Sequence, residues 1–404
     1  MSDIYQSGIV TALPRLVDDL TEALEKAILR YARQFPVSLV IPMLPAEMDR
    51  PALAGILDEL ERVPYLESVL VSLNGAGEND YTRAREYFAR YSGRLVLLWS
   101  EAPAVGRLLS DMEASGLDVG VPGKGRACWL AIGYLLAEGK ARYMAFQDAD
   151  VVNFRREMLA RLVLPALDPT VDFDFVKGYY ARVSDRLHGR ATRLLVGPLL
   201  AAFRRLVGEH PYISYLSSFR YALSGEFAVQ SDLALRMRLA CDWGLEIVTL
   251  FEALRHRAPT RICQAELAER YDHKHQDLSS EDPERGLHRM ARDVTKHLLR
   301  TLAAAGLSLP DGLLRSLLAA YQREAEDAVE DSYAMSVLNG LLYDRHAEEL
   351  IVHTFTSALR ASTAEFLVDP LGLPLVPNWS RVWAGMPEAG GRLLEAVERG
   401  PDGG

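Results

Sequence analysis

The sequence predicts an α/β protein with a mainly parallel, doubly wound sheet and a helical C-terminal extension. Over the first 150 residues, short apolar runs alternate with longer amphipathic segments, which is the order typical of βα units. From about residue 283 to 365 the pattern becomes almost wholly helical. A chain of 404 residues is long enough for one large domain and an appendage.

The expected elements follow one another along the first half of the chain. Apolar spacing and charge predict an amphipathic helix over residues 8–34. Strands are expected at residues 37–45, 68–73, 95–99 and 143–146, separated by helices at residues 50–62, 80–91 and 126–138. A further strand is expected at residues 173–180, and the last five residues read as a frayed tail.

Composition excludes several classes of protein. A net charge of −10 leaves no basic surplus to neutralise phosphates, so we expect no general nucleic-acid binding. The first residues lack a signal-peptide pattern, and apolar runs such as Leu194 to Phe203 are too short to span a bilayer. We therefore expect a cytoplasmic protein without a membrane partner. Cys128, Cys241 and Cys263 lie far apart and form no zinc pattern, which favours buried, reduced thiols.

Gln147-Asp148-Ala149-Asp150 follows a run of four apolar residues and is the most informative segment. Two carboxylates one residue apart cannot both enter a core without a compensating charge. Ligands of open α/β sheets bind at the carboxyl ends of the strands, where a hard divalent cation joins carboxylates to phosphate oxygens. The simpler interpretation is a cap for the following helix, and the motif alone does not decide between the two.

Two common phosphate-binding motifs are absent from the sequence. Gly123-Lys124-Gly125 is not a Walker loop because neither Ser nor Thr follows the lysine, and no Gly-x-Gly-x-x-Gly follows the first expected strand. P-loop and dinucleotide-binding functions are therefore disfavoured.

A basic segment stands out against the acidic background and indicates an anionic ligand. It contains Arg182, Arg186, His188, Arg190 and Arg193. Within it, Gly189-Arg190-Ala191-Thr192 begins an expected helix, where free backbone N–H groups and a forked guanidinium can bind an oxyanion. A solvated helix start without a ligand is the alternative.

Further carboxylates and two histidines are also candidate functional residues. Leu223-Ser224-Gly225-Glu226 and the segment from Asp242 to Glu246 place small residues beside carboxylates, which suits sugar hydroxyls or a plain turn. His273 and His275, two residues apart, can each ligate a metal as neutral imidazole.

Taken in order, these motifs resemble the glucosyl-3-phosphoglycerate synthases and the related mannosyl-3-phosphoglycerate and glucosylglycerate synthases. The resemblance covers roughly residues 37 to 300. It is carried by Ile41-Pro42-Met43-Leu44 with Glu47, Gly123-Lys124-Gly125, Asp148-Ala149-Asp150, Gly189-Arg190 with Thr192, Gly225-Glu226, Gly244 with Glu246, and His273.

The resemblance implies a GT-A nucleotide-diphospho-sugar transferase fold and a Mg²⁺ or Mn²⁺ cofactor. It implies transfer of a hexose, with glucose preferred and mannose as the alternative, from UDP-glucose, GDP-glucose or GDP-mannose to the 2-hydroxyl of 3-phosphoglycerate or D-glycerate. The anomeric configuration would be retained, and the product would serve compatible-solute biosynthesis.

The family pattern also implies roles for individual residues. Metal binding would fall to Asp150 and His273, with His275 as the alternative. Catalysis would involve Glu246 and the backbone at Leu223 and Ser224. Acceptor binding would involve Gly189, Arg190, Ala191 and Thr192. The donor would contact Pro42, Leu44, Glu47, Ser72, Lys124, Asp148 and Ala149.

The resemblance suggests a division of the chain. We expect an N-terminal helix at residues 1–35, a catalytic domain at 36–280 and a helical, dimer-forming region at 281–404. Within the catalytic domain, the donor half would span 36–155 and the acceptor half 156–280. Pro45 and Ala46 replace the family's usual residues before Glu47, which puts the base preference in question.

Three other functions are compatible with parts of the pattern. A transferase acting on a lipid phosphate would need an apolar or basic amphipathic surface, and none is obvious. A nucleotidyltransferase would need a glycine- and arginine-rich loop where this chain has Pro42-Met43-Leu44-Pro45. A non-catalytic nucleotide-sugar sensor would keep the donor site but would not need an acceptor-binding motif. The presence of Gly189-Arg190-Ala191-Thr192 therefore disfavours a sensor.

Overall fold

A computed structural model describes residues 6, 8–270 and 286–400 of the chain, and it contains one eight-stranded sheet. The strand order is β1-β8-β6-β7-β5-β2-β3-β4. All neighbouring strands are parallel except β7, which is antiparallel to both β5 and β6. The strands are β1 (Thr11–Leu13), β2 (Val37–Met43), β3 (Leu66–Leu73), β4 (Leu95–Trp99), β5 (Tyr143–Phe146), β6 (Phe175–Tyr180), β7 (Phe227–Gln230) and β8 (Ile262–Ala268).

The half of the sheet formed by β5, β2, β3 and β4 confirms the predicted alternation. Strand β2 is buried at every position, as a central parallel strand covered on both faces should be. The intervening helices are α2 (Pro51–Leu60), α3 (Glu78–Phe88), α4 (Pro103–Ala114) and α5 (Lys124–Glu138), with a 3₁₀ turn at Pro45–Asp49. Helix α4 was not among the predicted elements, although Pro103 at its first turn suits a helix start.

The expected helix over residues 8–34 is wrong in its first half. Thr11–Leu13 forms the edge strand β1, which pairs in parallel with β8, and only α1 (Thr21–Ala32) is helical. Pro14 explains the difference, because proline lacks the N–H that a helix interior requires. The N-terminal segment therefore belongs to the sheet instead of forming a separate helical unit.

The other half of the sheet combines strands and helices from the middle of the chain. Its helices are α6 (Arg156–Leu167), α7 (Gly197–Val207), α8 (Pro211–Ser217), α9 (Ser231–Ala234) and α10 (Leu245–His256), with short turns at Ala191–Val196 and Pro259–Arg261. The turn at Ala191–Val196 is π-helical and runs directly into α7. Strands β3 and β4 lie on one side of β2 and β5 lies on the other, so the strand order reverses at β2 and β5, where a ligand site is expected.

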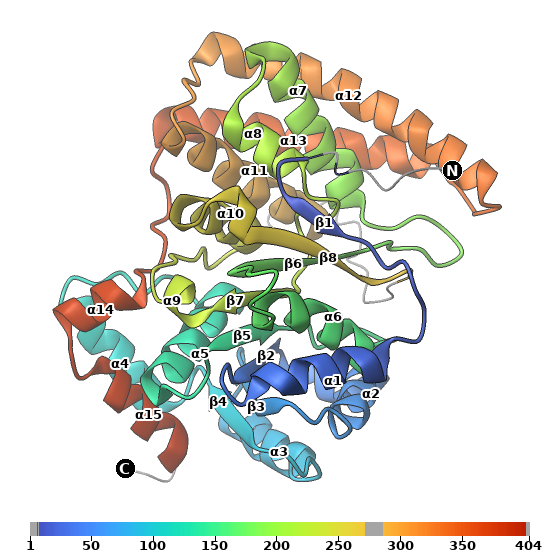
Figure 1. The fold of residues 1–404 in the computed structure, drawn as a ribbon. Coiled ribbons are helices and arrows are strands. Elements are labelled where there is room, and N and C mark those ends of the chain that lie inside the picture. The colour runs from blue at the N-terminus through green and yellow to red at the C-terminus, as the bar shows by residue number, and fades with distance from the viewer. Residues whose placement is uncertain (1–5, 7, 271–285, 401–404) are drawn as a thin grey trace.

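The C-terminal region is helical, as predicted, but packs in two separate places (Figure 1). Helices α11 (Gly286–Ala304), α12 (Asp311–Leu338) and α13 (Arg345–Val368) lie with α7 and α8 on the β6–β8 side. The chain then returns to the β4 side, where α14 (Trp379–Gly385) and α15 (Ala389–Arg399) pack near α4 and α5.

Aromatic packing holds the C-terminal segment against α5. The rings of Trp379 and Trp129 stack with centroids 4.8 Å apart. Each indole N–H donates to a backbone carbonyl, Trp129 to Pro377 at 2.7 Å and Trp379 to Trp129 at 2.8 Å. Because Trp129 belongs to α5, the C-terminal segment supports the helix that begins at Lys124.

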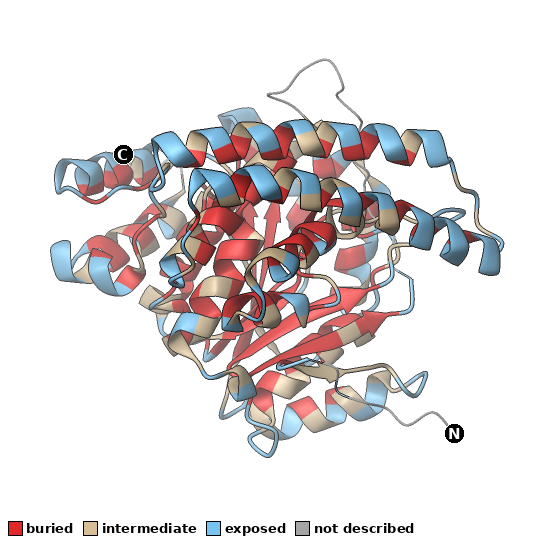
Figure 2. Cartoon of the chain, turned by 90° about the horizontal axis from the view of Figure 1, so that it is seen from above, coloured by how far each residue is buried: buried red, intermediate tan, exposed pale blue. Residues whose placement is uncertain are grey.

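Figure 2 shows the strands almost entirely buried between layers of helices, whose exposed residues face outward. Phe146, Phe175 and Phe227 stack across β5, β6 and β7 at the centre of this core. Among the described residues, no helix has both the length and the apolar character needed to cross a membrane.

Candidate active site

A cavity of about 960 Å³ lies at the carboxyl ends of β2 and β5. Its volume is at the upper end of the range for small-molecule sites. The cavity brings together residues predicted from distant parts of the sequence, namely Pro42, Leu44, Glu47, Lys124, Asp148, Ala149, Asp150, Gly189, Arg190, Ala191, Leu223 and Glu246. Three predicted residues, Ser72, Thr192 and Ser224, do not line it.

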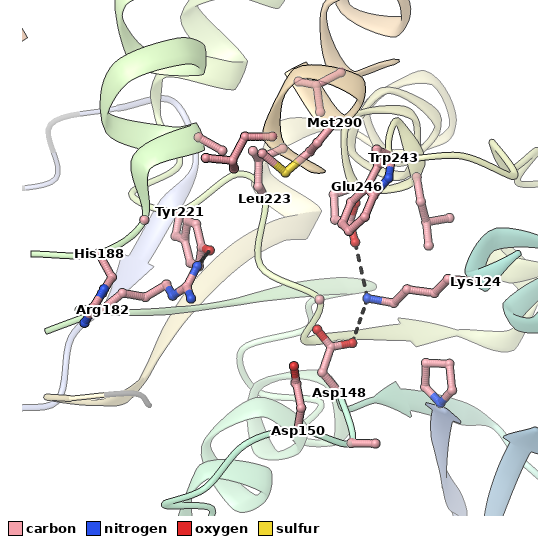
Figure 3. A pocket seen from close by; sticks show the side chains of 18 of the residues that line it. Lys124, Asp148, Asp150, Arg182, His188, Tyr221, Leu223, Trp243, Glu246 and Met290 are labelled. Carbon is pink, nitrogen blue, oxygen red and sulfur yellow. Dashed lines mark hydrogen bonds and ion pairs between the residues drawn. The ribbon is translucent and has the colours of Figure 1, made fainter. Parts of the chain in front are cut away.

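Asp148 and Asp150 follow the end of β5 and face the cavity, as Figure 3 shows. Lys124, the first residue of α5, lies between the carboxylates of Asp148 and Glu246. Its Nζ is 2.7 Å from Asp148 Oδ1 and 3.4 Å from Glu246 Oε1. Burial alone would lower the pKa of Lys124, but these two carboxylates raise it well above its ordinary value. A charged ammonium at a helix N-terminus is suited to bind phosphate oxygens.

The site carries more negative charge than Lys124 can balance. Burial raises the pKa of Asp150 to about 7, and the nearby carboxylates of Asp148, Glu47 and Glu226 add to the effect. A divalent cation would relieve this repulsion, and carboxylate oxygens are ligands that Mg²⁺ and Mn²⁺ accept. The residues therefore fit a hard metal ion. Among the described residues no three His, Cys, Asp or Glu side chains cluster with metal-binding geometry, and His273 and His275 lie outside those residues.

The end of β2 forms another wall of the cavity. Pro42 and Leu44 line it, and the side chain of Leu44 is exposed there. Glu47 is held by the 3₁₀ turn that begins at Pro45, so the residues that depart from the family pattern still bring Glu47 to the cavity. Ser72 is fully buried in β3 and donates to the carbonyl of Ala127 at 3.0 Å, on the other side of the cavity wall.

The basic segment forms the opposite side of the cavity. Arg182, Arg186, His188 and Arg190 all line it, whereas Arg193 does not. Gly189 has a φ of +68°, a conformation that glycine adopts without strain, and it precedes the π-helical turn. Thr192 Oγ1 is buried and has no hydrogen-bond partner in the part of the chain that the structure describes.

Helix α13 anchors two of these arginines through Glu348. The buried carboxylate accepts from Arg190 Nε at 3.3 Å and from Arg193 Nη2 at 2.8 Å. Arg193 also donates to the carbonyl of His188 and to Ser332 of α12. The C-terminal helices therefore hold the cationic side of the cavity in place.

The position of Glu246 depends on the loop before α10, and helix α11 contacts this loop. Asp242 accepts from the backbone N–H of Gly244 at 2.9 Å, and Gly244 is the residue directly before α10, which begins at Leu245 and carries Glu246. His297 of α11 lies 2.9 Å from the Asp242 carboxylate. Burial alone would raise the pKa of Asp242, but the bond with His297 contributes to lowering it. A side chain at Gly244 would collide with the His297 ring, so only glycine fits this contact.

No protein-family model matches the chain. Curated relatives do match over nearly its whole length. The glucosyl-3-phosphoglycerate synthase of Persephonella marina is 39% identical over 98% of both chains. The enzyme of the same name from Methanococcoides burtonii is 34% identical over 98% of this chain and 97% of its own. The chain belongs to the glucosyl-3-phosphoglycerate synthase family.

Solved structures agree on the fold. Glucosyl-3-phosphoglycerate synthase from Mycobacterium tuberculosis, crystallised with Mn²⁺, UDP-glucose and phosphoglyceric acid, superposes with a TM-score of 0.54 at 24% identity. The match covers 74% of this chain and 89% of that one. The same enzyme with Mg²⁺ and UDP gives a TM-score of 0.53. The present chain thus has the GT-A fold of this glycosyltransferase family, with a helical C-terminal region.

Several lining residues of this family member were missed by sequence reasoning. Asn74 directly follows the strand expected at residues 68–73 but was not among the predicted site residues; it is buried, lines the cavity and donates to the carbonyl of Met43 at 3.0 Å. Tyr180 and Tyr221 carry no motif of their own. Arg289 and Met290 come from α11, which was assigned to a separate helical region. Of these, only Asn74 had a usable signal, because it follows a strand expected to end at the site.

Proposed function

We propose that this protein transfers glucose from a nucleoside diphosphate glucose to the 2-hydroxyl of 3-phosphoglycerate. The observation that carries the proposal is a single cavity with a lysine-and-carboxylate side and an arginine-rich side. Two substrates that each bear phosphate need two such anion-binding sides facing one reacting position. Family membership supports the choice of glucose and of phosphoglycerate.

The donor would bind on the side formed by β2, α5 and the end of β5. Pro42, Leu44 and Glu47 would contact the nucleoside, while Lys124 and the N-terminus of α5 would bind the diphosphate. Asp148 and Ala149 would lie beside the ribose or sugar. Asp150 would hold Mg²⁺ or Mn²⁺ together with His273, or with His275 in its place. When bound, the cation would neutralise charge on the departing diphosphate.

The acceptor would bind on the side formed by the basic segment. Gly189, Arg190 and Ala191 present a helix start and a guanidinium to the cavity, and Thr192 follows them. These groups would bind the phosphate or carboxylate of 3-phosphoglycerate, with Arg182 adding a further positive charge. Arginine suits this role because its fork matches the geometry of oxyanions.

Glu246 would accept hydrogen bonds from sugar hydroxyls, and the backbone at Leu223 and Ser224 would lie beneath the anomeric carbon. We propose retention by front-face attack, in which the departing phosphate oxygen takes the proton of the acceptor hydroxyl. Glu246 is paired with Lys124 at 3.4 Å, which suits a binding role. Trapping of a covalent glucosyl intermediate on Glu246 would contradict front-face attack.

An activity matrix tests the proposed function. UDP-glucose, GDP-glucose and GDP-mannose are each combined with 3-phosphoglycerate, D-glycerate or glycerol 3-phosphate, with Mg²⁺, Mn²⁺ or a chelator. We expect glucosyl-3-phosphoglycerate to form from a glucose donor and only with metal. The absence of any glycerate-type product with every donor would overturn the proposal. Homodimer formation, a cytoplasmic location and a role in compatible-solute biosynthesis stay predictions.

A further inference from the structure

The segment Leu223–Gly225 lies where the two sides of the cavity meet. Leu223 and Gly225 line the cavity, and Figure 3 shows Leu223 between Arg182 and Tyr221 on one side and Lys124 and Glu246 on the other. Gly225 lies directly against Asp148, since an added Cβ would collide with the Asp148 carboxylate. A group that passes between the two sides must pass this segment, which we call the cavity floor.

Strand β6 makes two hydrogen bonds to Ser224 of the cavity floor and one to the next residue after the floor, Glu226. The Lys177 ammonium donates to the carbonyl of Ser224 at 2.6 Å. The Ser224 hydroxyl donates back to the carbonyl of Gly178 at 2.6 Å, and the N–H of Gly178 donates to the carbonyl of Glu226 at 2.9 Å. Lys177 and Ser224 are each only 1% exposed, so water does not compete for these bonds.

A buried ammonium is a costly way to hold one carbonyl if packing alone is needed. Burial lowers the pKa of Lys177 to about 8, although the carboxylates of Glu246 and Glu226 favour the charged form and oppose this shift. The Phe227 ring lies 5.8 Å from the ammonium and adds a weak cation–π contact. Lys177 is not itself among the residues that line the cavity.

The bond to Lys177 also sets the direction of the next peptide group. The described residues contain no cis peptide bond, so the N–H of Gly225 points opposite to the Ser224 carbonyl. Because that carbonyl is turned down toward Lys177, the Gly225 N–H is turned away from β6. The ammonium therefore fixes the orientation of the peptide group that joins Ser224 to Gly225, next to Asp148.

We propose that Lys177 and Ser224 act as positioning residues that lock the cavity floor in the conformation needed for transfer. The inference rests on the proposed function, because it assigns the floor to the reacting sugar. Neither side chain needs to touch a substrate for this role. Their loss should therefore lower the rate of transfer while substrate binding on either side of the cavity persists.

The first test replaces Lys177 with Met, which fills similar space without charge. Loss of one charge-assisted hydrogen bond should lower kcat by roughly 10- to 100-fold. The KM for donor and acceptor should change by less than about threefold, because the walls that bind them are intact. A folded Lys177→Met variant whose kcat stays within twofold of wild type would overturn the inference. An increase of more than about threefold in both KM values, with kcat unchanged, would also overturn the inference.

The second test uses Ser224→Ala and remains decisive if Lys177→Met does not fold. Loss of this neutral bond should lower kcat by about 3- to 10-fold with both KM values retained. The matched control is Ser38→Ala, which removes a buried 2.9 Å bond to Ser68 near the start of β2 and should leave kcat unchanged. Equal activity of Ser224→Ala and Ser38→Ala would contradict the inference.

Failure of the proposed function gives a different pattern. It would appear as a wild-type protein that makes no glucosyl product from phosphoglycerate. The same variants are then compared by their hydrolysis of UDP-glucose and GDP-glucose, where the same loss of kcat is expected. Failure of the positioning role would appear as an active wild type with equally active variants.

Discussion

At the scale of single residues, the site depends on close approach between backbone and carboxylates. Gly225 lines the cavity against Asp148, and Gly244 lies against His297, and neither position has room for a Cβ. In both places the glycine allows a charged or polar side chain to lie against the backbone. Such positions determine where the functional carboxylates point.

Replacing Gly225 with Ala should reduce activity by at least about 100-fold, because Asp148 must move away from Lys124 and the metal position. Steady-state kinetics with a melting curve would check this. The control is Gly55→Ala, an exposed site in α2 where an added Cβ meets nothing within 4 Å. It should keep full activity and gain about 0.5–1 kcal/mol of stability. Comparable activity of the two variants would contradict the assigned contact.

Metal affinity should depend on pH through Asp150. In the metal-free fold its pKa is about 7, against an ordinary 3.8, so a bound cation must displace a proton below pH 7. The affinity for Mn²⁺ should therefore rise by up to about tenfold per pH unit and level off above pH 7. Between pH 4 and 7 the folded metal-free state binds more protons than the unfolded state, so its stability falls as pH rises. Calorimetric titration with Mn²⁺ from pH 5.5 to 7.5 measures this dependence. An affinity that does not change over that range would refute the prediction.

At the scale of elements, helices from the C-terminal region complete the cavity. Helix α11 supports the loop before Glu246 through His297, and α13 anchors Arg190 and Arg193 through Glu348. Trp379 stacks on Trp129 within α5, whose first residue is Lys124. The region expected to serve only as an interface is therefore part of the site's support.

Replacing Glu348 with Ala should raise the KM for the acceptor by about tenfold, because Arg190 loses its anchor, with little effect on the donor. It should also cost roughly 1–3 kcal/mol of stability, since a buried acceptor of two guanidinium bonds is removed. Kinetics and urea unfolding measure the two effects. The control Glu349→Ala removes an exposed pair with Arg345 and should change stability by less than about 1 kcal/mol. An unchanged acceptor KM in Glu348→Ala would show that α13 does not position the arginine.

At the scale of the whole molecule, the sequence pattern was reliable where apolar residues form distinct runs. Strands β2 to β5 are apolar runs between turn signals, so their pattern predicted them and the carboxylates after β5. It failed at β1, because three half-buried residues before Pro14 carry no strand periodicity. It also could not predict that α11 lines the cavity or that Glu348 of α13 binds Arg190, since both contacts arise only through long-range packing.

The placement of individual site residues shows the same limit. Asp148, Asp150, Lys124 and Arg190 meet at one cavity because parallel strands end at one edge of the sheet. The family resemblance placed Ser72 among the donor contacts, but side chains of a strand alternate between faces, and its hydroxyl faces α5. Lys177 looked like an ordinary strand residue, because no pattern in sequence marks a lysine that is buried beneath a loop.

We propose that one cavity binds the donor and the acceptor on opposite sides of the cavity floor. The most direct test measures donor and acceptor KM separately in Asp150→Asn and Arg190→Ala. Arg190→Ala should raise the acceptor KM by about tenfold or more while the donor KM changes by less than about threefold. Asp150→Asn should impair metal-dependent use of the donor and leave acceptor binding intact. Equal losses for both substrates in Arg190→Ala would contradict the division of the cavity.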